Sequence, residues 1–188
     1  MMPAARIAAV IELLSDGPEN VPAGQVLRRG LQKRRYAGSG DRAAISALFW
    51  TVHRTLARLG WHLQQHGYAP TPRVLVLAAL ALVDQLPAGD IAAMFGGDSK
   101  HAAVALDEEE IALVAAFEGR TQDVSSMPRD VLLEWPASLL ADVDAALGDA
   151  ADAELAAMRR EAATDLRINP LKVKDRRVVR DKLAGHGI

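Results

Sequence analysis

The sequence contains no cysteine among its 188 residues. This excludes disulfides, cysteine metal ligands and a cysteine nucleophile within the chain, and it agrees with the cytoplasmic location that we expect. Aromatic residues make up only 4% of the chain while alanine is abundant, a composition that favours helices over a β-sandwich or a barrel. The strongest apolar run, Val74–Val83, is too short to span a bilayer, so we expect no membrane partner.

Catalytic motifs are missing as well. The chain has neither type of glycine-rich phosphate loop, no paired-histidine zinc motif, and no nucleophile elbow around its serines. His62 and His66 stand four residues apart, a spacing that could share a metal ion on a helix. No carboxylate has matching spacing, so we interpret the pair as surface residues and assign this chain no metal, no cofactor and no catalytic residue.

One stretch organises the rest of the chain. Over Asp41–His66 the apolar residues recur in steps of three and four, which predicts a single helix about 39 Å long at 1.5 Å per residue. Gly60 is the candidate position for a break or bend in it. The positions expected to be buried are Leu48, Val52, Leu56 and Leu59.

The same periodicity predicts helices before and after this stretch. Arg73–Leu86 is apolar on nearly all sides, so we expect it at the centre of the core. The acidic run Asp107–Glu110 is interpreted as the solvated first turn of a helix. The other expected helices are Pro3–Ser15, Ala23–Tyr36, Ala88–Phe95, Leu106–Gly119, a helix from near Pro136 to Leu147, and Asp149–Ala162.

The C-terminal residues follow a different pattern. Thr164–Lys174 alternates apolar and polar residues around Pro170, which predicts an edge strand, and Asp175 is placed to cap a helix over Arg176–Ala184. The predicted fold class is therefore all-α, a helical bundle followed by a short strand–helix unit. We expect a helical domain over residues 1–148, a linker helix over 149–163, and the start of a truncated α/β domain over 164–188, so that the chain is a fragment.

Charge is strongly segregated along the chain. Eight bases and one acid lie between Pro22 and Gly60, whereas sixteen acids and three bases lie between Asp84 and Met158. From Arg159 onward there are nine bases and four acids. Two basic blocks flanking an acidic middle indicate a polyanionic partner better than the net charge of −2 does.

The densest basic block, RRGLQKRR over Arg28–Arg35, has two interpretations. Its side chains could follow the phosphates of RNA, or they could form an ordinary soluble helix face. Arg54 and Arg58 could extend the same surface. Tyr36 is a better candidate for stacking on bases than Trp50 or Trp61, which we expect to pack in the core or in an interface. The candidate RNA-binding residues are Arg28, Arg29, Lys33, Arg34, Arg35, Arg42, Arg167 and Lys172.

Two segments resemble a known family. GSGDRAAISALFWTVHRTL resembles the long helix of the NusB-like RNA-binding fold, where an Asp-Arg pair begins the helix. The segment from Glu134 to Leu183, and LRINPLK within it above all, is similar to the region that joins this fold to the catalytic part of RsmB/Fmu (Sun) type RNA cytosine-5 methyltransferases. Two departures stand out, since Trp135 precedes its proline and DEEEIALVAAFEG replaces an asparagine-containing helix.

The resemblance implies an RNA-binding N-terminal region that positions ribosomal RNA for a catalytic domain outside this sequence. S-adenosylmethionine would be the cofactor of that parent enzyme, and the catalytic domain would be a partner of this region. Two alternatives stay open: a NusB-like transcription antitermination factor, and a helical module whose acidic middle binds a basic partner.

Overall fold

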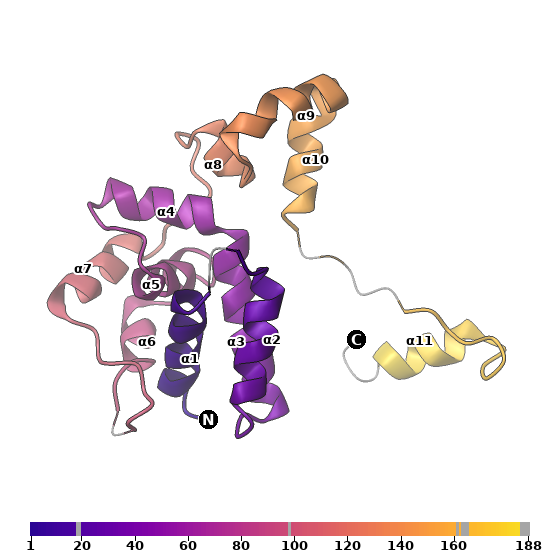
Figure 1. The fold of residues 1–188 in the computed structure, drawn as a ribbon, viewed down its shortest axis with the longest axis horizontal. Coiled ribbons are helices and arrows are strands. Elements are labelled where there is room, and N and C mark those ends of the chain that lie inside the picture. Colours follow the sequence, from indigo (N-terminus) through magenta and orange to yellow (C-terminus); the bar gives the residue numbers. More distant parts are fainter. Residues whose placement is uncertain (18–19, 98, 161, 163–165, 185–188) are drawn as a thin grey trace.

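The computed structural model describes residues 1–17, 20–97, 99–160, 162 and 166–184, and these residues form helices and loops without any strand (Figure 1). The α-helices are α1 (Pro3–Ser15), α2 (Ala23–Lys33), α3 (Ser39–Arg54), α4 (Leu56–Gln65), α5 (Pro72–Leu82), α6 (Ala88–Ala93), α7 (Glu108–Phe117), α8 (Arg129–Leu133), α9 (Leu140–Leu147), α10 (Ala151–Met158) and α11 (Arg176–Ala184). Two short 3₁₀ helices, η1 (Ala137–Leu139) and η2 (Gly148–Ala150), flank α9. The all-α prediction is thus confirmed for the described residues.

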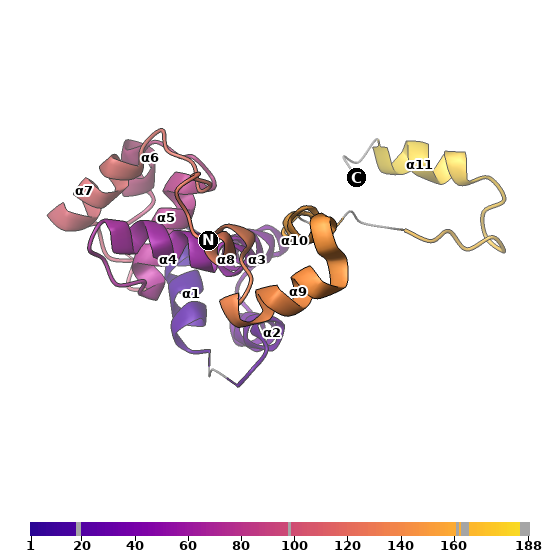
Figure 2. The ribbon, with the colours of Figure 1, turned by 90° about the horizontal axis from the view of Figure 1, so that it is seen from above.

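Helix α5 is the centre of the core, as its composition predicts. All nine residues from Val74 to Leu82 are buried, and α5 contacts α1, α3, α4, α6 and α7, which surround it in Figure 2. Pro72 begins the helix, where the missing N–H costs nothing. Each fully buried Leu or Val contributes about 1.5–3 kcal/mol, so this helix supplies a large part of the hydrophobic stabilisation.

The predicted long helix is broken, and the break is at Thr55 and not at Gly60. Thr55 has φ −126° and ψ 20°, and its hydroxyl donates to the carbonyl of Thr51 at 2.7 Å. Gly60 lies inside α4 and is buried. The change of direction turns Leu56 outward, where it is 44% exposed, whereas Val52 and Leu59 are buried as expected and Leu48 is half-buried.

A carboxylate from far along the chain closes the N-terminus of α4. Glu134, just after α8, accepts the backbone N–H of Ala57 at 2.8 Å and that of Arg58 at 3.0 Å. The same carboxylate accepts Arg58 Nε at 3.0 Å, and Asp123 accepts Arg58 Nη1 at 2.6 Å. Arg58 is therefore buried, at 4% exposure, and this joint attaches α8 to the first bundle.

The acidic run at the start of α7 is only partly solvated. Glu108 and Glu109 are exposed as expected, but Glu110 is buried and receives Arg73 Nε at 2.5 Å and Nη2 at 2.8 Å. Asp107 is the N-cap, because its side chain accepts the N–H of Glu110 at 2.8 Å. The interpretation of Glu110 as solvated is wrong, since it anchors α7 to α5.

Helices α8, α9 and α10 form a group of their own, in which α10 contacts both α8 and α9. Met127, Leu133, Ala151 and Leu155 are buried within it. The expected helix from Pro136 begins as η1 and continues as α9. Arg159 Nη1 donates to the carbonyl of Leu132 at 2.7 Å and so attaches the end of α10 to α8.

The C-terminal segment agrees with the prediction in one half only. Helix α11 has the expected bounds, and Asp175 Oδ1 accepts the N–H of Arg177 at 2.9 Å. The strand is not formed in residues 166–174, and Thr164 and Asp165 lie outside the described residues. Asn169 makes a turn instead, accepting the N–H of Leu171 at 3.0 Å, since one extended segment has no partner strand.

Figure 1 shows α11 apart from the helical bundles, and none of its residues is buried. Within the described part of the chain, every helix is too short or too polar to cross a membrane.

The Glu134 joint gives a stability prediction. Replacement of Glu134 by Ala removes the largely buried carboxylate beside Arg58 and leaves Asp123, which is half exposed, so we expect a loss of about 3 kcal/mol in urea denaturation. Glu118→Ala removes an exposed acid and is the matched control, expected within about 0.5 kcal/mol of wild type. Equal stabilities for the two variants would show that the joint contributes little.

Candidate nucleic-acid interface

Helix α2 carries the row of bases that the sequence singled out. Arg28, Arg29 and Lys33 are exposed on it. The helix ends at Lys33, because Arg34 leaves helical geometry with φ −94° and ψ 61°. The expected helix through Tyr36 is therefore three residues too long. Arg35 lies beyond the end of α2 and is exposed.

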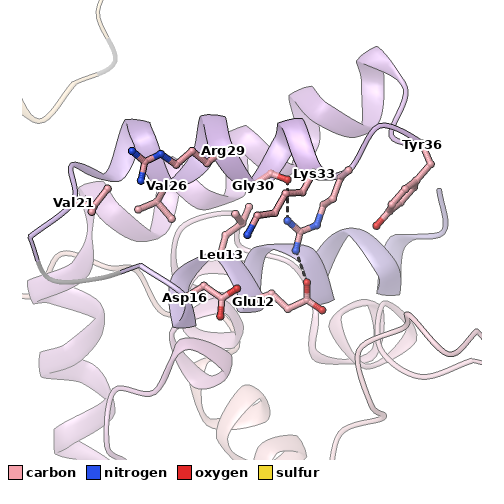
Figure 3. A pocket seen from close by; sticks show the side chains of 10 residues that line it. Glu12, Leu13, Asp16, Val21, Val26, Arg29, Gly30, Lys33 and Tyr36 are labelled. Carbon is pink, nitrogen blue, oxygen red and sulfur yellow. Dashed lines mark hydrogen bonds and ion pairs between the residues drawn. The ribbon is translucent and has the colours of Figure 1, made fainter.

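Arg34 and Arg42 have structural partners. Arg34 forms an ion pair with Glu12 of α1 and donates through Nη1 to the carbonyl of Gly30 at 3.0 Å (dashed lines in Figure 3). Arg42 donates to the carbonyl of Ala37 at 3.0 Å and to that of Arg34 at 3.3 Å. Both guanidinium groups therefore stabilise the turn between α2 and α3, which leaves fewer of their donors for a phosphate.

Between α1 and α2 lies a cleft of about 460 Å³, shown in Figure 3. Glu12 of α1 and Asp16, just after that helix, line one side, and α2 contributes Arg29 and Lys33. Tyr36 lies at one end and is 70% exposed, the arrangement required of a side chain that stacks on a base. The cleft is therefore acidic on the α1 side and basic on the α2 side.

The N-terminus of α3 is already occupied by a carboxylate of the chain. Asp41 accepts the N–H of Gly38 at 3.2 Å and Arg6 Nε at 2.8 Å. Desolvation by itself would raise the pKa of Asp41, but the hydrogen bonds from Arg6 and Gly38 hold that pKa below its usual value. The negative charge of Asp41 thus already interacts with the positive end of the α3 dipole, next to Arg42.

The expectation that Arg58 extends the basic surface is wrong, because the joint with Glu134 and Asp123 buries it. Arg54 is exposed. Trp50 packs against the core, with its ring centroid 5.5 Å from that of Phe49, and is half-buried like Trp61.

Arg167 and Lys172 are exposed in the segment before α11. Figures 1 and 2 both show this segment away from α2, so the structure does not bring these two residues to the α1–α2 cleft.

His62 lies in α4, and His66 directly follows its last residue. His62 is buried at 4% exposure, not on the surface as expected, and its Nε2 lies 3.2 Å from the carbonyl oxygen of Gln122. Within the described ranges, no three His, Cys, Asp or Glu residues gather in a group that could hold a metal ion.

Two residues of the cleft were missed from the sequence, namely Glu12 and Asp16. Their spacing of four on the outer face of α1 was the available signal, since it places two acids side by side opposite a basic helix.

Comparisons with protein-family models, with curated proteins and with solved structures found no match to this chain.

The close approach of α1 and α2 gives a second prediction. A methyl group on Gly30 would lie 1.9 Å from Cδ2 of Leu13, which is 4% exposed. We expect Gly30→Ala to destabilise by about 1–3 kcal/mol in urea denaturation, because overpacking outweighs the gain in helix propensity. Gly24→Ala in the same helix meets only Trp50 at 3.9 Å and is expected to be neutral or stabilising; a loss of equal size there would remove the packing explanation.

The half-buried His53 and the buried His62 give a prediction for pH. Desolvation lowers the pKa of His53 and of His62 below the usual 6.5, although the Gln122 carbonyl opposes this at His62. The unfolded chain therefore takes up these protons first, so stability is complete above about pH 6.5 and is lost as pH falls through the folded-state pKa values. We expect the thermal midpoint to fall from pH 7.5 to pH 5.5, and to fall less in His53→Gln/His62→Gln. A double variant with an unchanged slope would contradict this cause.

Proposed function

We propose that this chain is an RNA-binding module, the N-terminal region of an S-adenosylmethionine-dependent ribosomal RNA cytosine-5 methyltransferase of the RsmB/Fmu type. The observation that carries the proposal is the row of exposed bases along α2, formed by Arg28, Arg29 and Lys33 and continued by Arg35. The module positions RNA, and the methyl transfer belongs to a catalytic domain that this sequence does not contain.

The physical basis is counterion release. An exposed guanidinium or ammonium group that neutralises a phosphate releases a condensed cation, which supplies affinity independent of sequence. Arg29 lies about one turn before Lys33, so these two side chains follow the helix axis as a phosphate backbone requires, and Arg28 is exposed beside Arg29. Tyr36, at the end of this row, adds a surface on which one unpaired base can stack.

The resemblance supports the link to a methyltransferase. The Gly-Asp-Arg sequence stands at the start of α3, and LRINPLK precedes α11, in the order that the family has. The alternative, a NusB-like antitermination factor that acts by itself, does not require the LRINPLK segment.

A second candidate function is a protein-interaction module. Acids are exposed at the start of α7, among them Glu108 and Glu109, and separately on α9, where Asp142 lies; either group suits a basic partner, for which a catalytic domain of the same protein is one candidate. A pull-down against a separately produced catalytic domain distinguishes this from RNA binding.

Titration with RNA tests the proposed function. We expect the wild type to bind ribosomal RNA oligonucleotides with an affinity that falls steeply as salt rises. Arg28→Gln/Arg29→Gln should bind more weakly, and its plot of log affinity against log salt should be shallower by about 1.4, at about 0.7 per lost contact to single-stranded RNA.

The control variant is Lys100→Gln/Arg120→Gln, which removes two exposed charges of the same sign away from α2. Equal losses in the two double variants would mean that net charge, and not the α2 row, governs binding. A wild type without salt-dependent RNA affinity would end the proposal.

A further inference from the structure

A second basic site lies where α3, α4 and the end of α10 meet. This arginine cavity has a volume of about 330 Å³. Of the described residues that line it, four are arginines (Arg54, Arg58, Arg159 and Arg160) and one is an acid, Asp123. The fold thus brings the two basic blocks of the sequence together across the acidic middle.

Asp123 lies between two of these arginines. Its Oδ1 is 2.6 Å from Arg58 Nη1 and 3.6 Å from Arg159 Nη1, and its side chain is half exposed. Arg159 also has a buried Nε without a hydrogen-bond partner among the described residues. Arg160 is exposed and makes no side-chain hydrogen bond or ion pair with them.

This is the arrangement that recognises an oxyanion. Guanidinium groups present planar, paired donors that match the oxygens of a phosphate, and convergence of several arginines raises the charge at one point. The carboxylate of Asp123 stands where a phosphate oxygen would be bound, so an internal acid competes with any external anion for Arg58 and Arg159.

Exposed Arg54 connects the cavity with the α2 surface, although buried Arg58 does not extend that surface. A methyl group on Gly24, at the start of α2, would lie 3.9 Å from Trp50 of α3, so the two helices lie side by side there. Arg54 is one turn beyond Trp50, about 6 Å along the axis of α3. One strand can therefore pass from Arg28 and Arg29 toward the cavity.

We propose that the arginine cavity holds a backbone phosphate of the RNA bound along α2, and that Asp123 lowers the affinity by competing for the same arginines. This inference rests on the proposed function and adds a specific site and a built-in competitor to it.

Two variants of the full chain test it in opposite directions. In fluorescence anisotropy with the RNA oligonucleotides, Arg160→Gln should weaken binding severalfold and make the salt dependence shallower by about 0.7. Asp123→Asn should bind severalfold more tightly. The controls are Arg120→Gln, on the same loop as Asp123 but outside the cavity, and Asp142→Asn, an exposed acid on α9.

Stability is measured in parallel, because Asp123→Asn removes a partner of buried Arg58; Arg160→Gln touches no such contact and carries the test by itself. If Arg160→Gln behaves as Arg120→Gln while Arg28→Gln/Arg29→Gln loses affinity, this inference fails and the proposed function stands. If the wild type binds no RNA, both fail.

Arginine Nε–Hε resonances identify the source of the phosphate. Shifts of the Arg58, Arg159 and Arg160 signals with RNA, at concentrations where inorganic phosphate leaves them unchanged, support a backbone phosphate. Shifts with inorganic phosphate and none with RNA would make the cavity a site for a free anion and overturn the assignment.

Discussion

The carboxylate of Glu134 accepts three N–H groups at once. Two are backbone groups in the first turn of α4, and the third is Nε of the Arg58 side chain. A broken helix exposes backbone donors that an unbroken one would have used, and these must find partners when they are buried. The break at Thr55 creates such donors, and the residue after α8 supplies the acceptor. The direction of α4, the burial of Arg58 and the attachment of α8 all depend on this contact.

The arginines of this chain divide into two groups by what surrounds them. Arg34, Arg42, Arg58 and Arg73 each hold a carbonyl or carboxylate of the chain and fix a turn or a helix end. Arg28, Arg29 and Arg160 are exposed at the surface. A sequence run such as RRGLQKRR contains both kinds, so its total charge overstates what is available to RNA. The argument from α2 depends on the second group, whereas the arginine cavity combines exposed Arg160 with Arg58 and Arg159, whose donors are partly used within the chain.

The helices with strong periodicity were predictable, and the corners between them were not. Pro3–Ser15 and Arg176–Ala184 have their predicted bounds, because each has an apolar stripe and a local start or stop signal. The break at Thr55 has no such signal, since the carboxylate that caps α4 after the break, Glu134, is 77 and 76 residues from its partners Ala57 and Arg58, and Gly60 was the obvious local breaker. The burial of Glu110 could not be predicted from the sequence either, because its partner Arg73 is 37 residues away and only the fold brings the two together. Of the candidate site, the α2 row was visible in the sequence, whereas the arginine cavity required Asp123 and Arg159 to be placed beside Arg58.

The long separation between α4 and its capping carboxylate has a consequence for synthesis. A nascent chain that ends before Glu134 already contains α1 to α7 and the buried residues of α5, yet the first N–H groups of α4 can reach only water. The corner between α3 and α4 then has the bonds of Thr55 to Thr51 and Val52 and the ion pair of Arg58 with Asp123, but it lacks the cap from Glu134. The ribosome must deliver α8 before the first bundle acquires its final corner, so the order of translation separates formation of the core from completion of its outer joint.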